Sequence, residues 1–479
     1  MNVLMRNRII LFLPLFLFFA LGVRANDENI GLLAAIDIAL AQSDFAHDLQ
    51  EDIVLSQMGV AAAEHRFDTK LVPLSNIGYT QGTGSQLLGM EFRKELKTGA
   101  SISYGVVGDR IDDNRGYVVD NPTSAKAYVK ISQGLFRRWG VKYNLVNLSA
   151  AELRDKEKAI RAERSKQTFV LNVVQKYYDV VQAKQLLKKT EKALERSREH
   201  LDSAKARQVV GLVSKVDVYR AELAALDAES MLQNQLRQKR KAVDSFRELL
   251  RLSEETVFSV SEMIVQMTPV VSESWEEDLF KTRLDWQAHR VRAELNKLEI
   301  YKAQQDLTPD VGLSFTLEQK GEGESIEDAV ILDQTNWSIQ LEMLSSLDTF
   351  NEESALIRKK IDKAKLRRSK EALSRQIKRE VSEAFQDLIA EEKDYQISIK
   401  RLRQAEMALD LAMTRYEKGL SDNLDVLDAE TAYSEAGFGI SRALTGYNLA
   451  SVSLAYKLGV LDRQWIEMSL KSTKEVLQP

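Results

Sequence analysis

The sequence predicts a fold of mixed α and β structure, in which an internal duplication supplies long α-helical hairpins and two sets of strands. Three observations predict it. Residues 131–251 repeat at residues 339–459 with a constant offset of 208 (339 − 131) and no gap, and a repeat of this size organises the whole chain. Prolines are absent from 123–268 and from 310–478, so both tracts can carry very long helices. Apolar residues alternate with polar ones after Pro309, which is typical of strands.

The first segment predicts export. Arg6 and Arg8 precede an apolar run from Ile9 to Val23, and the polar Asn26 follows soon after. This pattern indicates a cleaved signal peptide over residues 1–25, because the apolar run is short for a membrane span; an uncleaved anchor is the alternative. No later stretch approaches the ~20 apolar residues of a membrane helix. We therefore expect the exported chain to enter a membrane only as strands.

Composition excludes several classes of protein. The chain has no cysteine, which excludes disulfides, thiol metal sites and a lipid-modified N-terminal cysteine. Its net charge of −4, from 67 basic and 71 acidic residues, gives no bulk attraction to nucleic acid. Charged residues make up 29% of the chain and are mixed in sign along the helical tracts, which is typical of long solvated helices.

Each repeat is expected to begin with a shorter helical segment that ends at a proline, to continue as strands and to finish as a long helical hairpin. The predicted domains are a signal peptide at 1–25, a first repeat at 26–260, a linker at 261–274, a second repeat at 275–470 and a tail at 471–479. The first repeat has a helical segment Ile30–Phe67, strands within 72–136 and a hairpin tip near 211. The second repeat has a helical segment Trp275–Leu307, strands within 310–344 and a hairpin tip near 419.

The first repeat carries extra residues among its strands. The offset is 236 between Pro73 and Pro309 but 208 at the hairpin tips, so the difference is 236 − 208 = 28 residues. We expect an additional hairpin that contains Gly89–Phe92 and Ala100–Val107. The polar loops that follow, at 108–121 and 321–333, suit the exposed mouth of a barrel.

The strands cannot close a barrel within one chain. Two repeats supply about four principal strands, whereas the smallest membrane barrels have ~8. Unpaired strand edges are not tolerated in hydrocarbon, because each backbone donor and acceptor needs a partner there. The sequence therefore predicts a transmembrane β-barrel completed by oligomerisation, and three copies with four strands each would supply twelve (3 × 4), an even number.

Five signatures then carry a resemblance to a known family. They are the two helix-to-strand transitions Leu71-Val72-Pro73-Leu74-Ser75 and Leu307-Thr308-Pro309-Asp310-Val311, the strand exit from Ile131 to Gly140, the turn Val210-Gly211-Leu212, and the block from Tyr416 to Glu430. In this order and duplicated, they make the mature chain resemble the TolC family of outer-membrane channel proteins over essentially its whole length.

The resemblance implies a homotrimeric β-barrel in contact with outer-membrane lipid, continued into the periplasm by an α-barrel tunnel. It further implies the exit duct of a tripartite efflux or type I secretion system. The expected partners are a periplasmic adaptor (membrane fusion) protein and an inner-membrane pump, with no nucleic acid and no cofactor. Drugs, metal ions and proteins are all possible cargo for such a duct.

The resemblance also places the periplasmic tip, where adaptors dock, at the two glycine turns. The matching positions are Val210, Gly211 and Leu212 in the first turn and Lys418, Gly419 and Leu420 in the second. Glycine suits the reversal of two long antiparallel helices because it accepts a positive φ without steric cost.

By the same resemblance, Asp425 and Asp428 constrict the pore near this tip. Their spacing of three places both on one helix face, so that copies around an axis would form stacked acidic rings that attract cations. The alternative is that both are helix caps or solvated acids. For Asp217 in the first turn this alternative, a cap or a solvated acid, is the preferred interpretation, because Arg220 stands at the position equivalent to Asp428. Some members of the family use an arginine in this turn to hold the tip closed, but Ser421-Asp422-Asn423 offers none. Either Lys215 or Lys418 pairs with these acids, or the tip is closed in another way.

Enzyme chemistry is not predicted. His47, His65, His200 and His289 are scattered without metal-ligand spacing, and no nucleophile, phosphate-loop or zinc motif is found. We therefore expect neither catalytic residues nor a metal site. The competing function is structural: an exported coiled-coil or adaptor protein of the periplasm, whose strands form a soluble domain.

Overall fold

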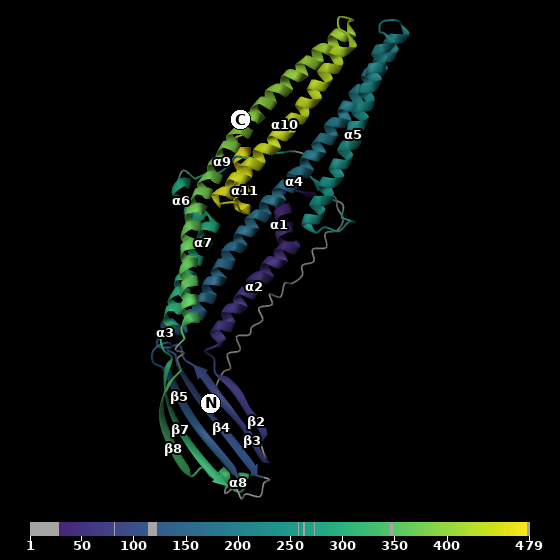
Figure 1. Cartoon of the computed structure of the whole chain (residues 1–479). Helices are drawn as coiled ribbons and strands as arrows, with labels where there is room; N and C mark the ends of the chain where they lie inside the picture. Colours follow the sequence, from purple (N-terminus) through teal and green to yellow (C-terminus); the bar gives the residue numbers. More distant parts are fainter. Residues whose placement is uncertain are drawn as a thin grey trace. The chain divides into compact units, whose positions relative to one another are not determined.

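The computed structural model describes residues 28–476, except 81, 114–121, 257, 262–263, 273 and 345–347. The predicted signal peptide and much of the loop at 108–121 therefore lie outside the described residues. The chain divides into two compact units. We call residues 28–47, 167–275 and 380–476 the helical unit, and residues 48–166 and 276–379 the sheet unit. Helices α4 (Val146–Val209) and α9 (Phe350–Glu417) contribute to both (Figure 1).

The helical unit combines the far halves of α4 and α9 with elements from three other parts of the chain. These are β1 (Glu28–Ile30), α1 (Leu32–Gln42), α5 (Lys215–Leu250), β6 (Phe258–Val260), α10 (Asn423–Leu458) and α11 (Arg463–Val476). β1 pairs in parallel with β6, so the first described residues are joined to the segment that follows α5.

The core of the helical unit lies where α1, α4, α5 and α11 meet. Ile36, Val173, Phe246 and Ile466 are fully buried in it. Tyr177 and Tyr178 are also buried there, with the edge of one ring toward the face of the other and the ring centres 5.7 Å apart. Burial of these side chains holds together helices that are far apart in sequence.

The predicted linker at 261–274 takes part in this packing. Met267 is fully buried and its N–H donates to Asn448 Oδ1 at 2.8 Å. Asn448 Nδ2 in turn donates to the carbonyl of Val265 at 2.8 Å and to the hydroxyl of Tyr178. The predicted tail at 471–479 begins inside α11, which continues to Val476.

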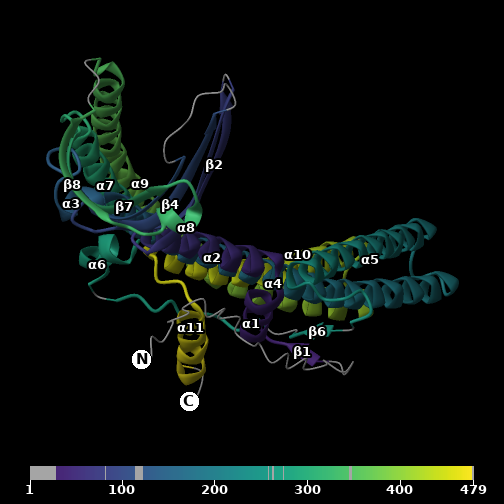
Figure 2. The ribbon, with the colours of Figure 1, turned by 90° about the horizontal axis from the view of Figure 1, so that it is seen from below.

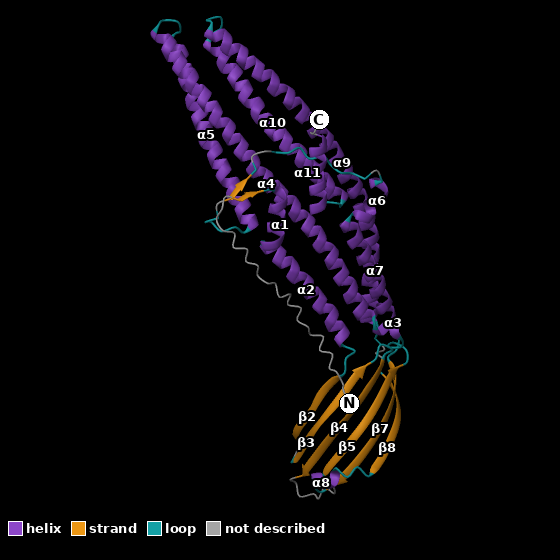
Figure 3. Cartoon of the chain, turned by 180° about the vertical axis from the view of Figure 1, so that it is seen from behind, coloured by secondary structure: helices purple, strands orange, loops and turns teal. Residues whose placement is uncertain are grey.

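The sheet unit contains a single antiparallel sheet of six described strands, in the order β2-β3-β4-β5-β7-β8 (Figure 3). Their bounds are β2 Lys70–Thr80, β3 Thr83–Glu95, β4 Ala100–Asp113, β5 Thr123–Gly134, β7 Val311–Gly323 and β8 Gln334–Met343. The helices of this unit, besides the near halves of α4 and α9, are α2 (Asp44–His65), α3 (Val141–Asn144), α6 (Trp275–Thr282), α7 (Leu284–Gln305) and α8 (Ile326–Ala329). Figure 2 shows that the sheet is curved.

The two faces of the sheet differ in polarity. One row of directly paired residues runs across all six strands and is apolar throughout: Leu71, Phe92, Tyr104, Val129, Leu317 and Trp337. The neighbouring row points to the other face and consists of Val72, Glu91, Gly105, Tyr128, Glu318 and Asn336. Alternation of this kind separates an apolar face from a polar one on every strand.

The polar face lines a hollow of about 650 Å³. Tyr128 donates its hydroxyl to Glu91 Oε2 at 2.6 Å, across Gly105 on the strand between them. Glu91 also accepts from Arg93 Nε at 2.8 Å. The absence of a side chain at Gly105 allows the tyrosine and the carboxylate to meet, so the buried charge is compensated.

The sheet has six strands where the sequence predicted four principal ones. β4 and β5 lead into α4 as β7 and β8 lead into α9, so the hairpin without a counterpart in the second repeat is β2–β3. The segments predicted for the added hairpin, Gly89–Phe92 and Ala100–Val107, pair with each other as parts of β3 and β4, one strand further along the chain than β2–β3. The predicted mouth loop at 321–333 begins within β7 and contains α8.

Both predicted leading helices are interrupted. The segment Ile30–Phe67 begins at the last residue of β1 and then divides at Ser43 into α1 and α2, and Ser43 Oγ accepts from the N–H of Ala46. The segment Trp275–Leu307 divides at Arg283 into α6 and α7. Arg283 is 1% exposed and pairs with Asp285 at 2.5 Å. At Ser43 the side chain caps the start of α2, which offers the backbone an alternative to helix continuation.

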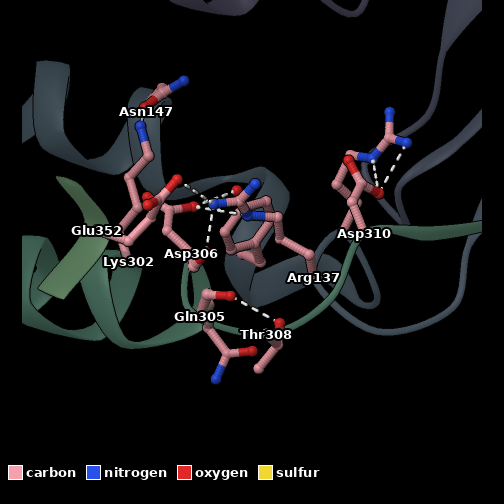
Figure 4. Close-up of polar contacts among 10 residues, drawn as sticks. Arg137, Asn147, Lys302, Gln305, Asp306, Thr308, Asp310 and Glu352 are labelled. Atoms are coloured by element: carbon pink, nitrogen blue, oxygen red, sulfur yellow. Dashed lines mark hydrogen bonds and ion pairs between the residues drawn. The ribbon is translucent and has the colours of Figure 1, made fainter. Parts of the chain in front are cut away.

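Two of the sequence signatures contact each other where the strands meet the helices (Figure 4). Arg137, just after β5, donates to the carbonyl of Asp306, just after α7, and lies 3.8 Å from Glu352 at the start of α9. Tyr143 donates to Asp306 Oδ1 at 2.7 Å. Burial is the main cause, and this hydrogen bond the second, that raises the pKa of Tyr143 to about 12. Arg138 pairs with Asp310 at 2.9 Å. The strand exit and the Pro309 transition therefore form one junction.

Candidate functional site

The predicted tip residues form two turns with the same backbone geometry. In the first, Gly211 has φ of 78°, its N–H donates to the carbonyl of Gln208 at 3.0 Å, and that of Leu212 donates to Arg207 at 2.9 Å. In the second, Gly419 has φ of 70°, and its N–H donates to the carbonyl of Tyr416 at 3.0 Å. The N–H of Leu420 donates to the carbonyl of Arg415 at 2.8 Å. Each turn is a Schellman motif, in which a left-handed glycine lets the last helical carbonyls find donors.

The helices that follow the turns are capped in different ways. Ser214 and Asp217 form a capping box, with backbone-to-side-chain bonds of 3.2 and 3.0 Å. Asp217 is therefore a cap residue, as its sequence context indicated. In the second turn Asp422 is the N-cap and accepts from the N–H groups of Leu424 and Asp425, both at 3.1 Å. Each cap satisfies N–H groups that lack a partner within the helix.

The two turns are joined to each other through side chains. Arg207 at the end of α4 donates to the carbonyl of Tyr416 at 2.6 Å, and its guanidinium lies 4.3 Å from the centre of that ring. Asn423 donates to the carbonyl of Asp217 at 3.1 Å. The neighbouring ends of four helices are thus linked, and the link uses a buried asparagine and a positive charge at a helix C-terminus.

His200 extends this network along α4. Its Nε2 lies within hydrogen-bond distance of Asn423 Oδ1. Because the amide nitrogen of Asn423 already donates to Asp217, the oxygen faces His200 and Nε2 must carry the proton. Burial lowers the pKa of His200, so the neutral imidazole is favoured.

Further contacts tie α4 to α10 below the turns. Arg196 donates from Nη2 and Nε to Glu430 Oε1 at 2.7 and 2.8 Å, and its guanidinium lies over the ring of Tyr433. Lys189 donates to the hydroxyl of Ser441 at 2.7 Å, and burial lowers the pKa of its amine. These residues fix the position of α10 and therefore of the second turn.

The turns present apolar side chains to solvent. Leu212 is 73% exposed, Val210 68% and Leu420 66%, and Lys418 is also exposed. Exposed leucine and valine side chains on rigid, capped turns are suited to contact another protein.

The structure places Asp425 and Asp428 on the exposed face of α10, opposite the buried Asn423 and Val426. Neither is the N-cap. Asp425 accepts a bond of 2.5 Å from the hydroxyl of Ser421, which supports the turn. Asp428 projects one turn further along the helix.

Sequence reasoning missed the residues that join the turns. It suggested Lys215 or Lys418 as partners of the tip acids, whereas the joining residues in the structure are Arg207, His200, Tyr416 and Asn423. No periodicity or motif marked them, because each acts on a partner about 200 residues away. Only the repeat offset, which aligns the two turns, pointed to this neighbourhood.

A search of the described residues finds no group of three or more His, Asp or Glu side chains arranged to hold a metal ion. Among the helices in the described ranges, none combines the length and the apolar character needed to cross a membrane.

Comparisons with known proteins identify the fold. A membrane protein from Pseudomonas aeruginosa has a TM-score of 0.70 and 18% identity, over 89% of this chain and 90% of that one. VceC of Vibrio cholerae, an outer membrane protein, has a TM-score of 0.67 and 16% identity, over 89% and 96%. The MtrE outer membrane channel of Neisseria gonorrhoeae, in its open state, has a TM-score of 0.68 and 16% identity, over 92% and 93%. A comparison with curated protein sequences found no match.

The family model for outer membrane efflux proteins matches residues 105–250 and 277–460. The two matched segments correspond to the two repeats, and together they cover more than half of the chain. Each includes a long helical hairpin and its glycine turn. The chain therefore belongs to the outer membrane efflux protein family, as the resemblance indicated.

Proposed function

We propose that this protein is the exit duct of a tripartite efflux or type I secretion system, a passive channel completed by several copies of the chain. The observation that carries the proposal is the six-stranded sheet with one apolar and one polar face. Its strands have 10 to 14 residues, and ~9–11 tilted residues span a bilayer. An apolar face toward lipid and a polar face toward a lumen are what a channel needs.

Copies of the sheet complete the barrel in this proposal. β2 and β8 each pair with a single strand within the described chain, and an open edge in hydrocarbon is unstable. Three copies would contribute eighteen strands (3 × 6), rather than the twelve that the sequence suggested. A barrel with an even number of antiparallel strands, and with about this many of them, encloses an aqueous channel.

The glycine turns are the docking site for the periplasmic adaptor in this proposal, with Val210, Leu212 and Leu420 as the contact side chains. The Schellman motifs and the Arg207 link hold them in fixed positions. A preorganised apolar surface loses little conformational entropy on binding, which favours a stable complex with the adaptor and, through it, the pump.

Fractionation tests the channel against the competing structural role. We expect an outer-membrane oligomer that resists SDS until heated, because barrel strands with all their hydrogen bonds made in lipid are hard to separate. Membrane separation followed by SDS gels with and without boiling measures this. A soluble periplasmic monomer would contradict the proposal and favour the coiled-coil adaptor.

A further inference from the structure

A groove of about 750 Å³ lies on the apolar face of the sheet, at the strand ends opposite the junction around Arg137. The loop between β7 and β8, which contains α8, is at this end (Figure 3). Sites for small ligands have volumes of ~300–1,000 Å³. The hollow around Tyr128 is on the polar face, so the sheet separates it from the groove.

The floor of the groove consists of three rows of directly paired residues from β3, β4 and β5. The row nearest the strand ends is polar: Gln86, Arg110 and Thr123. The next two rows are apolar or small: Leu88, Gly108 and Ala125, then Met90, Val106 and Ala127. These residues alternate with those of the polar face, as the geometry of a strand requires. The floor therefore changes from polar at its outer end to apolar further in.

The helix α8 forms one side of the groove. Ile326 and Val330 line it and are exposed, whereas Ala329 is fully buried. Gly321 and Gly323 of β7 permit the close approach of α8 to the strands. A Cβ added to Gly321 would collide with the carbonyl oxygen of Ala329, and one added to Gly323 would collide with the residue before Ala329. Both glycines lie on the apolar face, so α8 folds over that face.

The β2–β3 hairpin, which has no counterpart in the second repeat, forms the other side. Pro73 pairs with Met90 and Ser75 pairs with Leu88, and all four residues line the groove. Leu88 is 63% exposed and Met90 54%, so the groove opens onto the surroundings of the sheet. The added hairpin and α8 thus build the groove together.

The length and polarity of the groove match one leaflet of a membrane. Its floor runs from Thr123 to Ala127 along β5, and four residues of a strand are ~14 Å long. This is about half of the ~30 Å hydrocarbon core of a bilayer. In the proposed channel the helices extend into the periplasm, so the end with Thr123 lies at the outer surface. The polar row is then at the level of the lipid head groups, and the apolar rows reach toward the middle of the membrane.

The backbone of the floor favours a hydrocarbon chain over a peptide. β3, β4 and β5 each pair with a strand on both sides, so their backbone groups already have partners. A peptide in the groove would find no strand edge to pair with, and its own N–H and C=O groups would remain unpaired in an apolar setting. A hydrocarbon chain has no such groups to satisfy.

The polar end of the groove offers a hydrogen bond that the described part of the chain does not use. Thr123 is 4% exposed, and its hydroxyl has no hydrogen-bond partner among the described residues. A buried hydroxyl without a partner costs free energy. The carbonyl oxygen of a lipid ester accepts from a hydroxyl, and lipid esters lie where the head groups meet the chains. An ester at Thr123 would therefore satisfy this group.

We propose that the groove binds one ester-linked acyl chain of a membrane lipid, with the ester at Thr123 and the chain running inward over Ala125 and Ala127. The site rests on the proposed channel, because only there does the apolar face meet lipid with α8 at the outer surface. It adds to that channel a defined lipid site, bounded by α8 and by the β2–β3 hairpin.

Native mass spectrometry of the purified oligomer, supplied with dimyristoyl phosphatidylethanolamine in detergent, tests the site. We expect each chain to retain one lipid. Ala127→Phe fills the floor, so the apparent affinity should fall at least about tenfold, the effect of excluding two methylene groups from burial. The matched control is Val129→Phe, on the same face of β5 but outside the groove. We expect this control to bind as the wild type does.

An ether analogue of the same lipid tests the contact with Thr123. The wild type should bind the ester about two- to tenfold more tightly than the ether, because the ether has no carbonyl to accept from the hydroxyl. Thr123→Val keeps the shape of the side chain and removes the hydroxyl, so this variant should not distinguish the two lipids. This measurement does not depend on the assembly of Ala127→Phe.

The outcomes separate the lipid site from the channel. Equal lipid retention in Ala127→Phe and Val129→Phe would overturn the site, and so would a Thr123→Val protein that still prefers the ester. If the wild type forms a normal outer-membrane oligomer in these experiments, the channel is unaffected. A wild-type chain that forms no outer-membrane oligomer would overturn both.

Discussion

Single residues at the tip show how local chemistry builds a rigid end on two long hairpins. Gly211 and Gly419 end their helices by the same Schellman geometry, since a left-handed residue is needed where the chain reverses. The acids that follow are not equivalent. Asp217 completes a capping box, whereas Asp428 is exposed on α10 beyond the cap formed by Asp422.

The difference between Asp425 and Asp428 makes a residue-level prediction about the pore. Asp428→Asn should shift the reversal potential toward zero in planar bilayers, because an acidic ring that attracts cations would be neutralised. Asp425→Asn should do the same, but should also destabilise the turn by about 0.5–1.5 kcal/mol, because a neutral oxygen then accepts the bond from Ser421 in place of a charged one.

Asp227→Asn, on the exposed side of α5, is the matched control for the loss of one negative charge. Selectivity that is unchanged in Asp428→Asn, or changed equally in the control, would show that Asp428 does not line the pore.

At the level of elements, the β2–β3 hairpin distinguishes the two repeats. The offset between Pro73 and Pro309 predicted an additional hairpin, and the structure shows that it continues the sheet in register with β4. Its apolar and polar rows continue those of the other strands. Two strands added to four multiply the circumference of any closed ring by 6/4, whatever the number of copies.

Cysteine labelling tests whether this hairpin lies in the membrane. Ile77→Cys on the apolar face should react with a lipid-soluble maleimide, and Asn76→Cys on the polar face with a water-soluble one, because neighbouring residues of a strand point to opposite faces. Ile339→Cys and Gln340→Cys in β8 are the matched controls. If both cysteines of β2 react alike with the water-soluble reagent while the β8 pair discriminates, the hairpin lies outside the bilayer.

At the level of the whole molecule, the repeats give the chain two equivalent turns that act together. A photo-crosslinker at Leu212 or Leu420 should capture a periplasmic adaptor in cells, since both side chains are exposed on rigid turns. The same crosslinker at Leu226, exposed on the side of α5, is the control. Absence of any periplasmic product at both turns, with the protein correctly localised, would remove the docking role.

Much of this organisation follows from the sequence alone. The duplication, the long helices, the two glycine turns and the alternation of the strands depend on periodicity and on residues that act within a few positions of themselves. The capping role of Asp217 also depends only on residues a few positions away. For this reason the mixed fold and the family were predictable from residues such as Gly211, Gly419 and Pro309.

Tertiary structure decided what depends on partners far away in the chain. The sequence predicted an added hairpin but not that β2–β3 extends the sheet, because strand pairing is a long-range choice. The sequence did not predict the hydrogen bonds from Arg207 to Tyr416 and from Asn423 to Asp217. A single polar residue forms no recognisable sequence pattern with a partner about 200 residues away. The break at Ser43 was missed because the bond from the N–H of Ala46 to the Ser43 side chain outweighs helix propensity there. Local sequence determined the elements, and contacts between distant residues determined how they are joined.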